Sequence, residues 1–258
     1  DDYALCRVGL APCSPFSVST DLMRESAELA RHYGVRLHTH LAENTEDIAY
    51  SESVYGMRPG DYAESCGWTG EDVWHAHCVQ LNESESAAFA ASGTGIAHCP
   101  CSNMRLGSGI APVARWIEQG VPVGLGVDGS ASNDAADMID EARHALLLQR
   151  VQHGPAAIDA QQILRLATRG GARVLGRQDI GALLPGMAAD FVAWRTDTLA
   201  FAGAESDLAA ALVFCKPGKV DLAVVQGRAL VEDSQLTMLD LPTLLKQHRS
   251  ISRQMING

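Results

Sequence analysis

The sequence has no long run of apolar residues, although 47% of its 258 residues are hydrophobic. No stretch approaches the roughly 18–20 consecutive apolar residues that a helix needs to cross a bilayer. Residues 1–3 have neither the basic nor the apolar character of a secretion signal. These absences predict a chain that does not span a membrane and carries no export signal at this position.

Basic residues are scarce, with Lys+Arg 20 against Asp+Glu 31 and a formal net charge of −11. Because polyanions would be repelled, nucleic acid and anionic membranes are not expected partners. The seven cysteines are an odd number, scattered through a chain long enough to bury a full core. A disulfide framework is therefore not expected, and the cysteine usage predicts a reducing, cytoplasmic location.

The first 150 residues alternate short β-rich runs with helical segments, a repetition that predicts parallel strands joined by right-handed crossovers. Each expected strand is a compact apolar run bounded by Gly, Pro or acidic residues, typical of strands buried on both faces. The expected strands are 4–10, 35–41, 72–79, 95–99 and 121–127. The expected helices are 21–33 with Thr20 as cap, 113–119 and 135–151.

The pattern changes after a helical segment at 157–176 that glycines interrupt. Residues 181–194 and 219–231 have the composition of a turn and antiparallel strands, and 241–255 is typical of a closing helix. We therefore predict two units. The first, residues 1–178, is built of five βα units, and the second, residues 179–258, holds the antiparallel strands and the last helix.

Ionisable side chains lie at the ends of the expected strands. His40 lies near the end of one strand with Glu43 just beyond it, His77 lies near the end of the next, and Asp128 follows the last. The C-terminal ends of parallel strands converge on one rim, where active sites lie. We therefore expect these groups, which are far apart in sequence, to be neighbours in space.

Two histidine pairs, His38/His40 and His75/His77, have members two residues apart. On a strand, both members of such a pair point to the same face. The later member of each pair is expected at the rim and the earlier one a layer deeper. His38 and His75 are thus predicted to be structural polar groups, with an additional metal ligand as the alternative.

Imidazole together with carboxylate is a ligand set that suits Zn²⁺ or Fe²⁺ and leaves a position open for water. Asp128 is predicted to hold the metal and to accept a proton from that water, while Glu43 passes a proton to the substrate. Cys99 and Cys101 are too closely spaced for a typical metal or redox pair, which favours packing or substrate contact. Gly124-Leu-Gly126 lacks the third glycine of a dinucleotide site.

Four segments in fixed order resemble the amidohydrolase superfamily, in particular its branch that deaminates or dechlorinates purines, pterins and triazines. The segments are His-Leu-Ala-Glu at 40–43, Ala-His-Cys at 76–78, residues 98–109, and Gly-Val-Asp-Gly-Ser-Ala-Ser-Asn at 126–133. This resemblance implies an α/β fold, namely a TIM-like (β/α)8 barrel whose strands 4–8 lie in this chain, plus part of a small β-sandwich domain.

The resemblance also implies roles for single residues. His40 and Asp128 would hold one divalent metal, zinc with iron as the alternative. Glu43 would protonate a ring nitrogen of the substrate, and His77 would contact the attacking water or the developing oxyanion. Catalysis is therefore expected from Glu43, His77 and Asp128. The residues expected to contact substrate are Cys13, Glu43, His77, Asn103 and Arg105.

The same resemblance implies a missing part. The family supplies two more metal ligands from a His-x-His pair after its first barrel strand, whereas this chain resembles the barrel only from the fourth strand on. A (β/α)8 barrel needs about 250 residues, and five units account for only part of it. We expect residues 1–258 to be the C-terminal part of a longer enzyme. Alone they are expected neither to fold stably nor to turn over substrate, since five strands leave two open edges.

For the intact enzyme the resemblance implies hydrolytic deamination of an aminated oxopurine, 8-oxoguanine foremost, with release of ammonia. One alternative is a hydrolase of guanine, adenosine-like compounds or triazines. The other is a catalytically inactive remnant that serves only in folding or assembly. The expected partners are a purine-like small molecule and further copies of the chain in a homo-oligomer.

Overall fold

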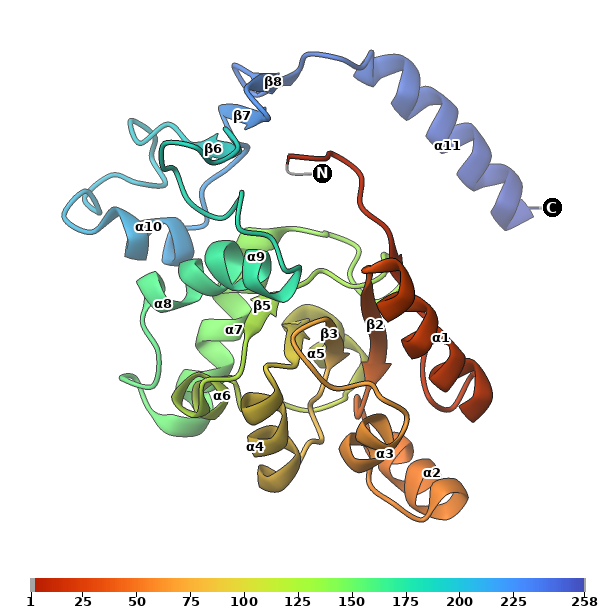
Figure 1. Ribbon diagram of the computed structural model, residues 1–258. Coiled ribbons are helices and arrows are strands. Elements are labelled where there is room, and N and C mark those ends of the chain that lie inside the picture. Colours follow the sequence, from red (N-terminus) through yellow and green to blue (C-terminus); the bar gives the residue numbers. More distant parts are fainter. Residues whose placement is uncertain (1–2, 258) are drawn as a thin grey trace.

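A computed structural model describes residues 3–257 (Figure 1). Its centre is a five-stranded parallel sheet in which strand order follows chain order. The strands are β1 (Gly9–Leu10), β2 (Arg36–Leu41), β3 (Val73–His77), β4 (Gly95–His98) and β5 (Val123–Leu125). Sequential order is the pattern of a barrel, because a doubly wound sheet reverses its order at a switch point. The predicted parallel α/β arrangement is confirmed, with each strand shorter than expected.

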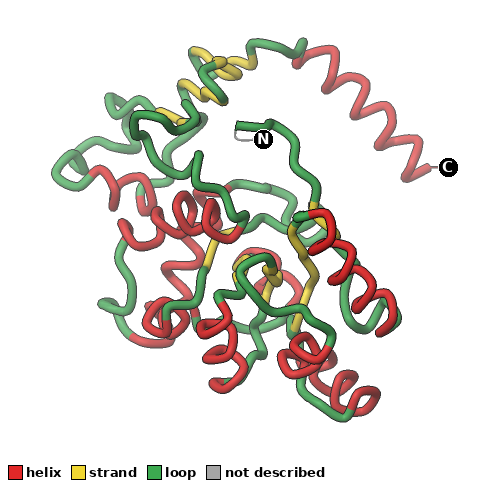
Figure 2. The backbone as a smooth tube through the Cα atoms, in the orientation of Figure 1, coloured by secondary structure: helices red, strands yellow, loops and turns green. Residues whose placement is uncertain are grey.

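Helices surround the short central strands (Figures 1 and 2). In the barrel part these are α1 (Thr20–Tyr33), α2 (Thr45–Tyr55), α3 (Pro59–Ser65), α4 (Glu83–Ser92), α5 (Pro100–Leu106), α6 (Val113–Gln119), α7 (Met138–His153), α8 (Ala160–Arg165) and α9 (Gly171–Val174). The expected cap of α1 is wrong by one residue. Ser19 is the N-cap, because its side chain accepts the Leu22 N–H, and Thr20 is already helical.

Alternation along β2 places its apolar side chains and its histidines on opposite faces of the sheet. In β2, Leu37 and Leu41 are fully buried in the core that the helices cover, whereas His38 and His40 lie on the opposite face. Trp68 is buried in the same core. The polar histidines of β2 are therefore on the inner face of the curved sheet.

At β5 the neighbouring helical segment packs backbone against backbone, with no side chains between them. A Cβ on Gly124 would lie 2.9 Å from Gly171 Cα, and a Cβ on Gly170 would lie 2.2 Å from the Val123 carbonyl oxygen. Gly170 ends a π-helical turn, η1 (Leu166–Gly170), between α8 and α9. These glycines are required for close packing of helix on strand. The predicted segment 157–176 is thus helical from Ala160 to Val174, with the π-turn ending at Gly170.

The remainder of the chain forms a four-stranded antiparallel sheet in the order β6-β7-β8-β9. Its strands are β6 (Phe191–Ala193), β7 (Leu222–Val225), β8 (Arg228–Glu232) and β9 (Gln235–Leu236). Helix α10 (Leu208–Phe214) packs on α7 and α8, and Val213 is buried in their shared core. Helix α11 (Leu241–Asn257) projects away from the body (Figure 1). Among residues 3–257, no helix has both the length and the apolar character that crossing a membrane requires.

A buried histidine in this fold predicts acid sensitivity. His98 is fully buried beside Trp116, and within residues 3–257 neither of its ring nitrogens has a hydrogen-bond partner. Burial lowers the pKa of His98 from 6.5 to about 3, with a smaller contribution from His77. Below pH 6.5 the His98 side chain is therefore protonated in the unfolded chain but stays neutral in the folded chain. The contribution of His98 to the free energy of unfolding is therefore fully present above pH 6.5 and is lost progressively as the pH falls toward 3.

We expect this histidine to reduce the free energy of unfolding by about 2 kcal/mol between pH 6.5 and pH 4.5. Urea unfolding of the natural gene product and of His98→Leu across this range measures the effect. The variant is expected to show a flatter pH profile, because leucine fills a similar volume and does not titrate. Parallel profiles for the two proteins would show that His98 is not the cause.

Candidate metal centre

The end of β2 presents His40 with its outer nitrogen free. The Cys13 carbonyl oxygen accepts hydrogen bonds from the His40 backbone N–H at 3.0 Å and from His40 Nδ1 at 2.6 Å. Because a carbonyl oxygen only accepts, Nδ1 carries the proton and Nε2 keeps its lone pair. This is the arrangement in which protein histidines bind metal, with the second nitrogen fixed by a backbone carbonyl.

His77 reaches the same place by a break in strand alternation. Residues 73, 75 and 77 of β3 would share the outer face, and His75 does lie there, stacked on Phe89 and bonded to the Trp68 carbonyl. His77 and Cys78, however, have left-handed backbones with φ of 69° and 54°. The prediction that both histidines of the pair share a face is therefore wrong.

A hydrogen bond to Asn103 fixes the orientation of the His77 ring. Its Nδ1–H donates to Asn103 Oδ1 at 2.8 Å, and both side chains are buried. Since an amide oxygen only accepts, His77 Nε2 is left as an open lone pair, as in His40. The two rings are stacked with centroids 5.4 Å apart.

Asp128 comes from the loop after β5 and also has a left-handed backbone, with φ of 60°. Its Oδ2 accepts hydrogen bonds from Ser102 Oγ at 2.5 Å and Ser132 Oγ at 3.0 Å. Burial raises the pKa of the Asp128 carboxyl, but these hydrogen bonds, with the Gly129 backbone and His77, outweigh it. The pKa therefore lies below its usual value, and the group is a carboxylate.

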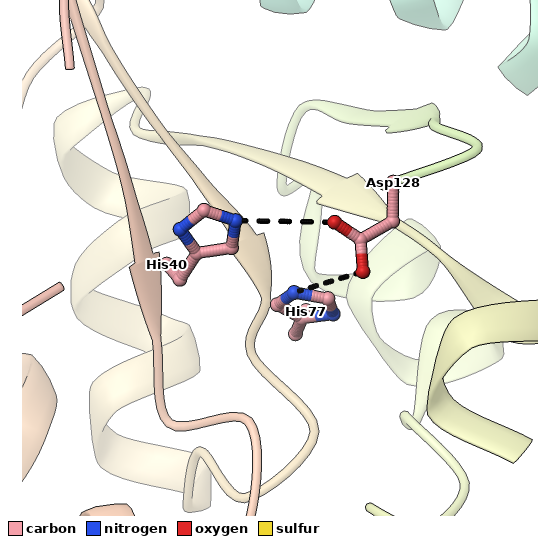
Figure 3. A group of neighbouring side chains, drawn as sticks. All are labelled: His40, His77 and Asp128. Atoms are coloured by element: carbon pink, nitrogen blue, oxygen red, sulfur yellow. Dashed lines mark ion pairs between the residues drawn. The ribbon is translucent and has the colours of Figure 1, made fainter. Parts of the chain in front are cut away.

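The three side chains converge on one point (Figure 3). Asp128 Oδ1 lies 3.9 Å from His40 Nε2, and Asp128 Oδ2 lies 3.8 Å from His77 Nε2. One donor atom from each residue lies within 4.8 Å of the others. Two imidazole lone pairs and one carboxylate form a donor set that suits Zn²⁺ or another borderline divalent ion. The residues present therefore fit a divalent metal.

Glu43 borders the same point. Its Oε2 lies 3.9 Å from His77 Nε2, and its Oε1 accepts a hydrogen bond from Ser108 Oγ at 3.1 Å. The Glu43 backbone N–H donates to Asp47 Oδ2 at 2.8 Å, which fixes the bend between β2 and α2. A carboxyl group this close to His77 Nε2 is placed for proton transfer to a substrate held there.

A family model, described as the amidohydrolase family, matches residues 2–230, which is most of the chain. The chain belongs to the amidohydrolase family. The prediction of the family from the segments at the strand ends is thus confirmed.

Individual relatives cover almost the whole of this amidohydrolase chain. It is 47% identical to an 8-oxoguanine deaminase from Pseudomonas aeruginosa over 100% of its length, and 36% identical to an isoxanthopterin deaminase from an unknown prokaryotic organism over 98%. Its structure is similar to that of an atrazine chlorohydrolase from Arthrobacter aurescens complexed with zinc, with TM-score 0.92, 36% identity and 97% of the chain covered. The chain spans 57%, 56% and 56% of these three proteins' lengths.

The other residues predicted at the amidohydrolase site lie at different depths. The Cys13 thiol is exposed, and its contribution to the centre is the carbonyl that binds His40. Arg105 is on the surface and pairs with Asp134. Asn103, expected to contact substrate, is instead fully buried behind His77. The structure therefore places Asn103 one layer away from the donor atoms.

The remaining histidine and cysteine predictions concern His38, Cys99 and Cys101. His38 lies a layer below His40, as expected, where it stacks on Trp74 and bonds to the Trp74 carbonyl. Cys99 is buried, and Cys101 bonds to a histidine of α7. Packing, one of the two interpretations favoured for these cysteines, agrees with this placement, and substrate contact stays a prediction.

Sequence reasoning missed the hydroxyl groups that hold the two carboxylates, which are Ser102, Ser108 and Ser132. Only Ser132 carried a local signal. It follows Asp128 by four residues in a Gly- and Ser-rich turn, a spacing at which a hydroxyl can reach back to the carboxylate. Ser102 and Ser108 contact partners 26 and 65 residues away, which no local pattern reveals.

Proposed function

We propose that these residues form part of the active site of a metal-dependent deaminase that hydrolyses an aminated oxopurine, with 8-oxoguanine as its substrate. The observation that carries this proposal is the convergence of two imidazole lone pairs and the Asp128 carboxylate beside Glu43. The 47% identity to an 8-oxoguanine deaminase supports the choice of substrate. Because the chain spans 57% of the length of that relative, the activity is proposed for the whole protein.

His40 and Asp128 are proposed as ligands of one divalent ion, zinc in preference to iron, because the atrazine chlorohydrolase of similar structure is complexed with zinc. Such an ion supplies Lewis acidity and makes hydroxide available near neutral pH. His77 is proposed to face the attacking oxygen, since its Nε2 lone pair points to the same place.

The proton transfers follow from the positions of the two carboxyl groups. Asp128 accepts one proton of the attacking water as the new C–O bond forms at the carbon that bears the amine. Glu43 donates a proton to the adjacent ring nitrogen. Asp128 then returns its proton to the exocyclic nitrogen, the C–N bond breaks and ammonia leaves. The hydroxyl proton of the intermediate returns to Glu43, so that the amine has been exchanged for a carbonyl oxygen.

Three further features remain part of the proposal. Cys13 and Arg105 border the substrate pocket from exposed segments. Residues 1–178 and 179–258 form the barrel part and the β-sandwich part. The protein assembles as a homo-oligomer, in which the acidic charge of −11 disfavours nucleic acid as a partner.

Ammonia release from a substrate panel tests the function. The natural gene product, loaded with zinc, is assayed with 8-oxoguanine, guanine, isoxanthopterin, adenosine and an aminated triazine. We expect the highest kcat/KM with 8-oxoguanine. An oxopurine that lacks one hydrogen-bonding group is expected to be rejected by as much as about 10⁴-fold, since buried polar groups would lose their partner.

The panel also separates the alternatives. A triazine hydrolase is the second candidate, because the atrazine chlorohydrolase has a TM-score of 0.92 to this chain. Preference for the triazine would replace the purine assignment. No ammonia from any compound, with zinc bound, would contradict the deaminase, and no chloride from a chlorotriazine in the same test would support an inactive remnant.

A further inference from the structure

A carboxylate is fully buried on α7, away from the metal centre. Glu141 is 0% exposed, and within residues 3–257 it makes no ion pair. Instead its Oε1 accepts a hydrogen bond from Asn133 Nδ2 at 2.6 Å, and its Oε2 accepts the Cys101 backbone N–H at 3.2 Å. Burial of an unpaired acid is costly unless its oxygens are satisfied. This position therefore needs a physical reason.

The two bonds join the segments that build the centre. Cys101 directly precedes Ser102, which donates to Asp128, and Asn103, which holds His77. On the other side, Asn133 Nδ2 also donates to the Val127 carbonyl at 2.8 Å, one residue before Asp128. One carboxylate on α7 thus connects the segment after β4 with the loop after β5.

A neighbouring side chain strengthens the hold on Cys101. His144, one helical turn after Glu141, has its Nδ1 3.1 Å from Cys101 Sγ. Burial, followed by the hydrogen bond and charge of Glu141, raises the pKa of the Cys101 thiol to about 12. The thiol therefore stays protonated, and its sulfur lies within hydrogen-bonding distance of His144. Residue 101 is fixed by α7 through both its backbone N–H and its side chain.

We propose that Glu141 is a positioning residue for the reaction, an inference that rests on the proposed function. By accepting one donor from each segment, it sets the distance between Asp128 and the His77–Asn103 pair. A carboxylate is required because two N–H donors converge on its two oxygens. Glutamine at this position has the same shape, but its amide group would face one of the two donors with a further N–H.

The same helix offers a matched control. Gln149 is eight residues further along α7 and is also fully buried. Its Oε1 accepts the Ala114 N–H at 3.0 Å and its Nε2 donates to the Ala111 carbonyl at 2.8 Å, so it holds the start of α6. Glu141→Gln and Gln149→Glu are therefore reciprocal exchanges of amide and carboxylate at two buried sites, and only the first touches the segments of the centre.

The experiment compares the two variants in the natural gene product. Both are expected to lower the Tm. Only Glu141→Gln is expected to lower kcat by about 10–100-fold, with KM changed less than about threefold, since loss of a group that orients ligand side chains acts on the reacting geometry. It is also expected to broaden or remove the NMR signal of the His77 Nδ1 proton, which Gln149→Glu leaves in place.

Equal losses of kcat and equal effects on the His77 proton in the two variants would overturn the proposal. If Glu141→Gln does not fold, Glu141→Asp takes its place, because it keeps both acceptors but is one methylene shorter. The same pattern is then expected with a smaller loss, about 3–10-fold. If the unsubstituted protein releases no ammonia, the proposed function fails, whereas the His77 signal still decides the role of Glu141.

Discussion

Asp128→Asn is expected to lower kcat by about 10³–10⁴-fold, the largest effect of any single substitution in the site. The asparagine oxygen still accepts a hydrogen bond from Ser102, so the loop keeps its anchor. The amide, however, neither takes up a proton from water nor carries the negative charge that holds a divalent ion beside His40. Both proposed roles of Asp128 are lost together.

Steady-state ammonia release, metal content and Tm measure this loss. Asp207→Asn is the matched control, because Asp207 caps α10 by accepting the Ala210 N–H at 2.9 Å and asparagine caps equally well. The control is expected to keep the activity and metal content of the parent. Normal kcat in Asp128→Asn would show that Asp128 neither holds the metal nor moves the proton.

Glu43→Gln is expected to lower kcat by about 10²–10³-fold with little change in KM. Glutamine keeps the shape of the side chain and still accepts from Ser108. It has no proton to donate to a ring nitrogen, so it removes an interaction made only as the reaction proceeds. The Tm is expected to stay close to that of the parent, since the backbone bond to Asp47 is unaffected.

Glu46→Gln serves as the control for this substitution. Glu46 is an exposed residue in the first turn of α2, three positions after Glu43, and accepts a hydrogen bond only from its neighbour Thr45 among the interactions described for residues 3–257. Activity assays of both variants with the preferred substrate separate the two positions. Near-full activity in Glu43→Gln would rule out the proton-shuttle role and leave Glu43 as a polar wall of the pocket.

Much of the fold could be predicted because buried parallel strands and their helices leave strong local patterns. The five strands and the helices α1 and α6 lie where apolar runs and turn residues indicate them. Boundaries were less accurate, since they depend on single hydrogen bonds. Thr20 is itself a good capping residue, and only the hydrogen bond from Leu22 N–H to Ser19 Oγ shows that Ser19 caps the start of α1.

The sequence predicted which residues meet at the candidate site better than it predicted how their side chains are oriented. His40, His77 and Asp128 do meet, because strand ends converge. The orientation of β3 was not predictable, since alternation places His75 and His77 on one face and two left-handed residues override it. Contacts between distant segments, such as Asn103 behind His77, also leave no pattern in sequence.

The left-handed backbones at residues 42, 77, 78 and 128 limit which amino acids directed evolution can place at these positions. β-Branched amino acids are strongly disfavoured in that conformation, whereas Gly, Asn and Asp tolerate it. Codon libraries at residues 42 and 78 should therefore leave out Val, Ile and Thr. If Cys13 and Arg105 border the substrate pocket as proposed, diversity is better introduced there, because their side chains are exposed.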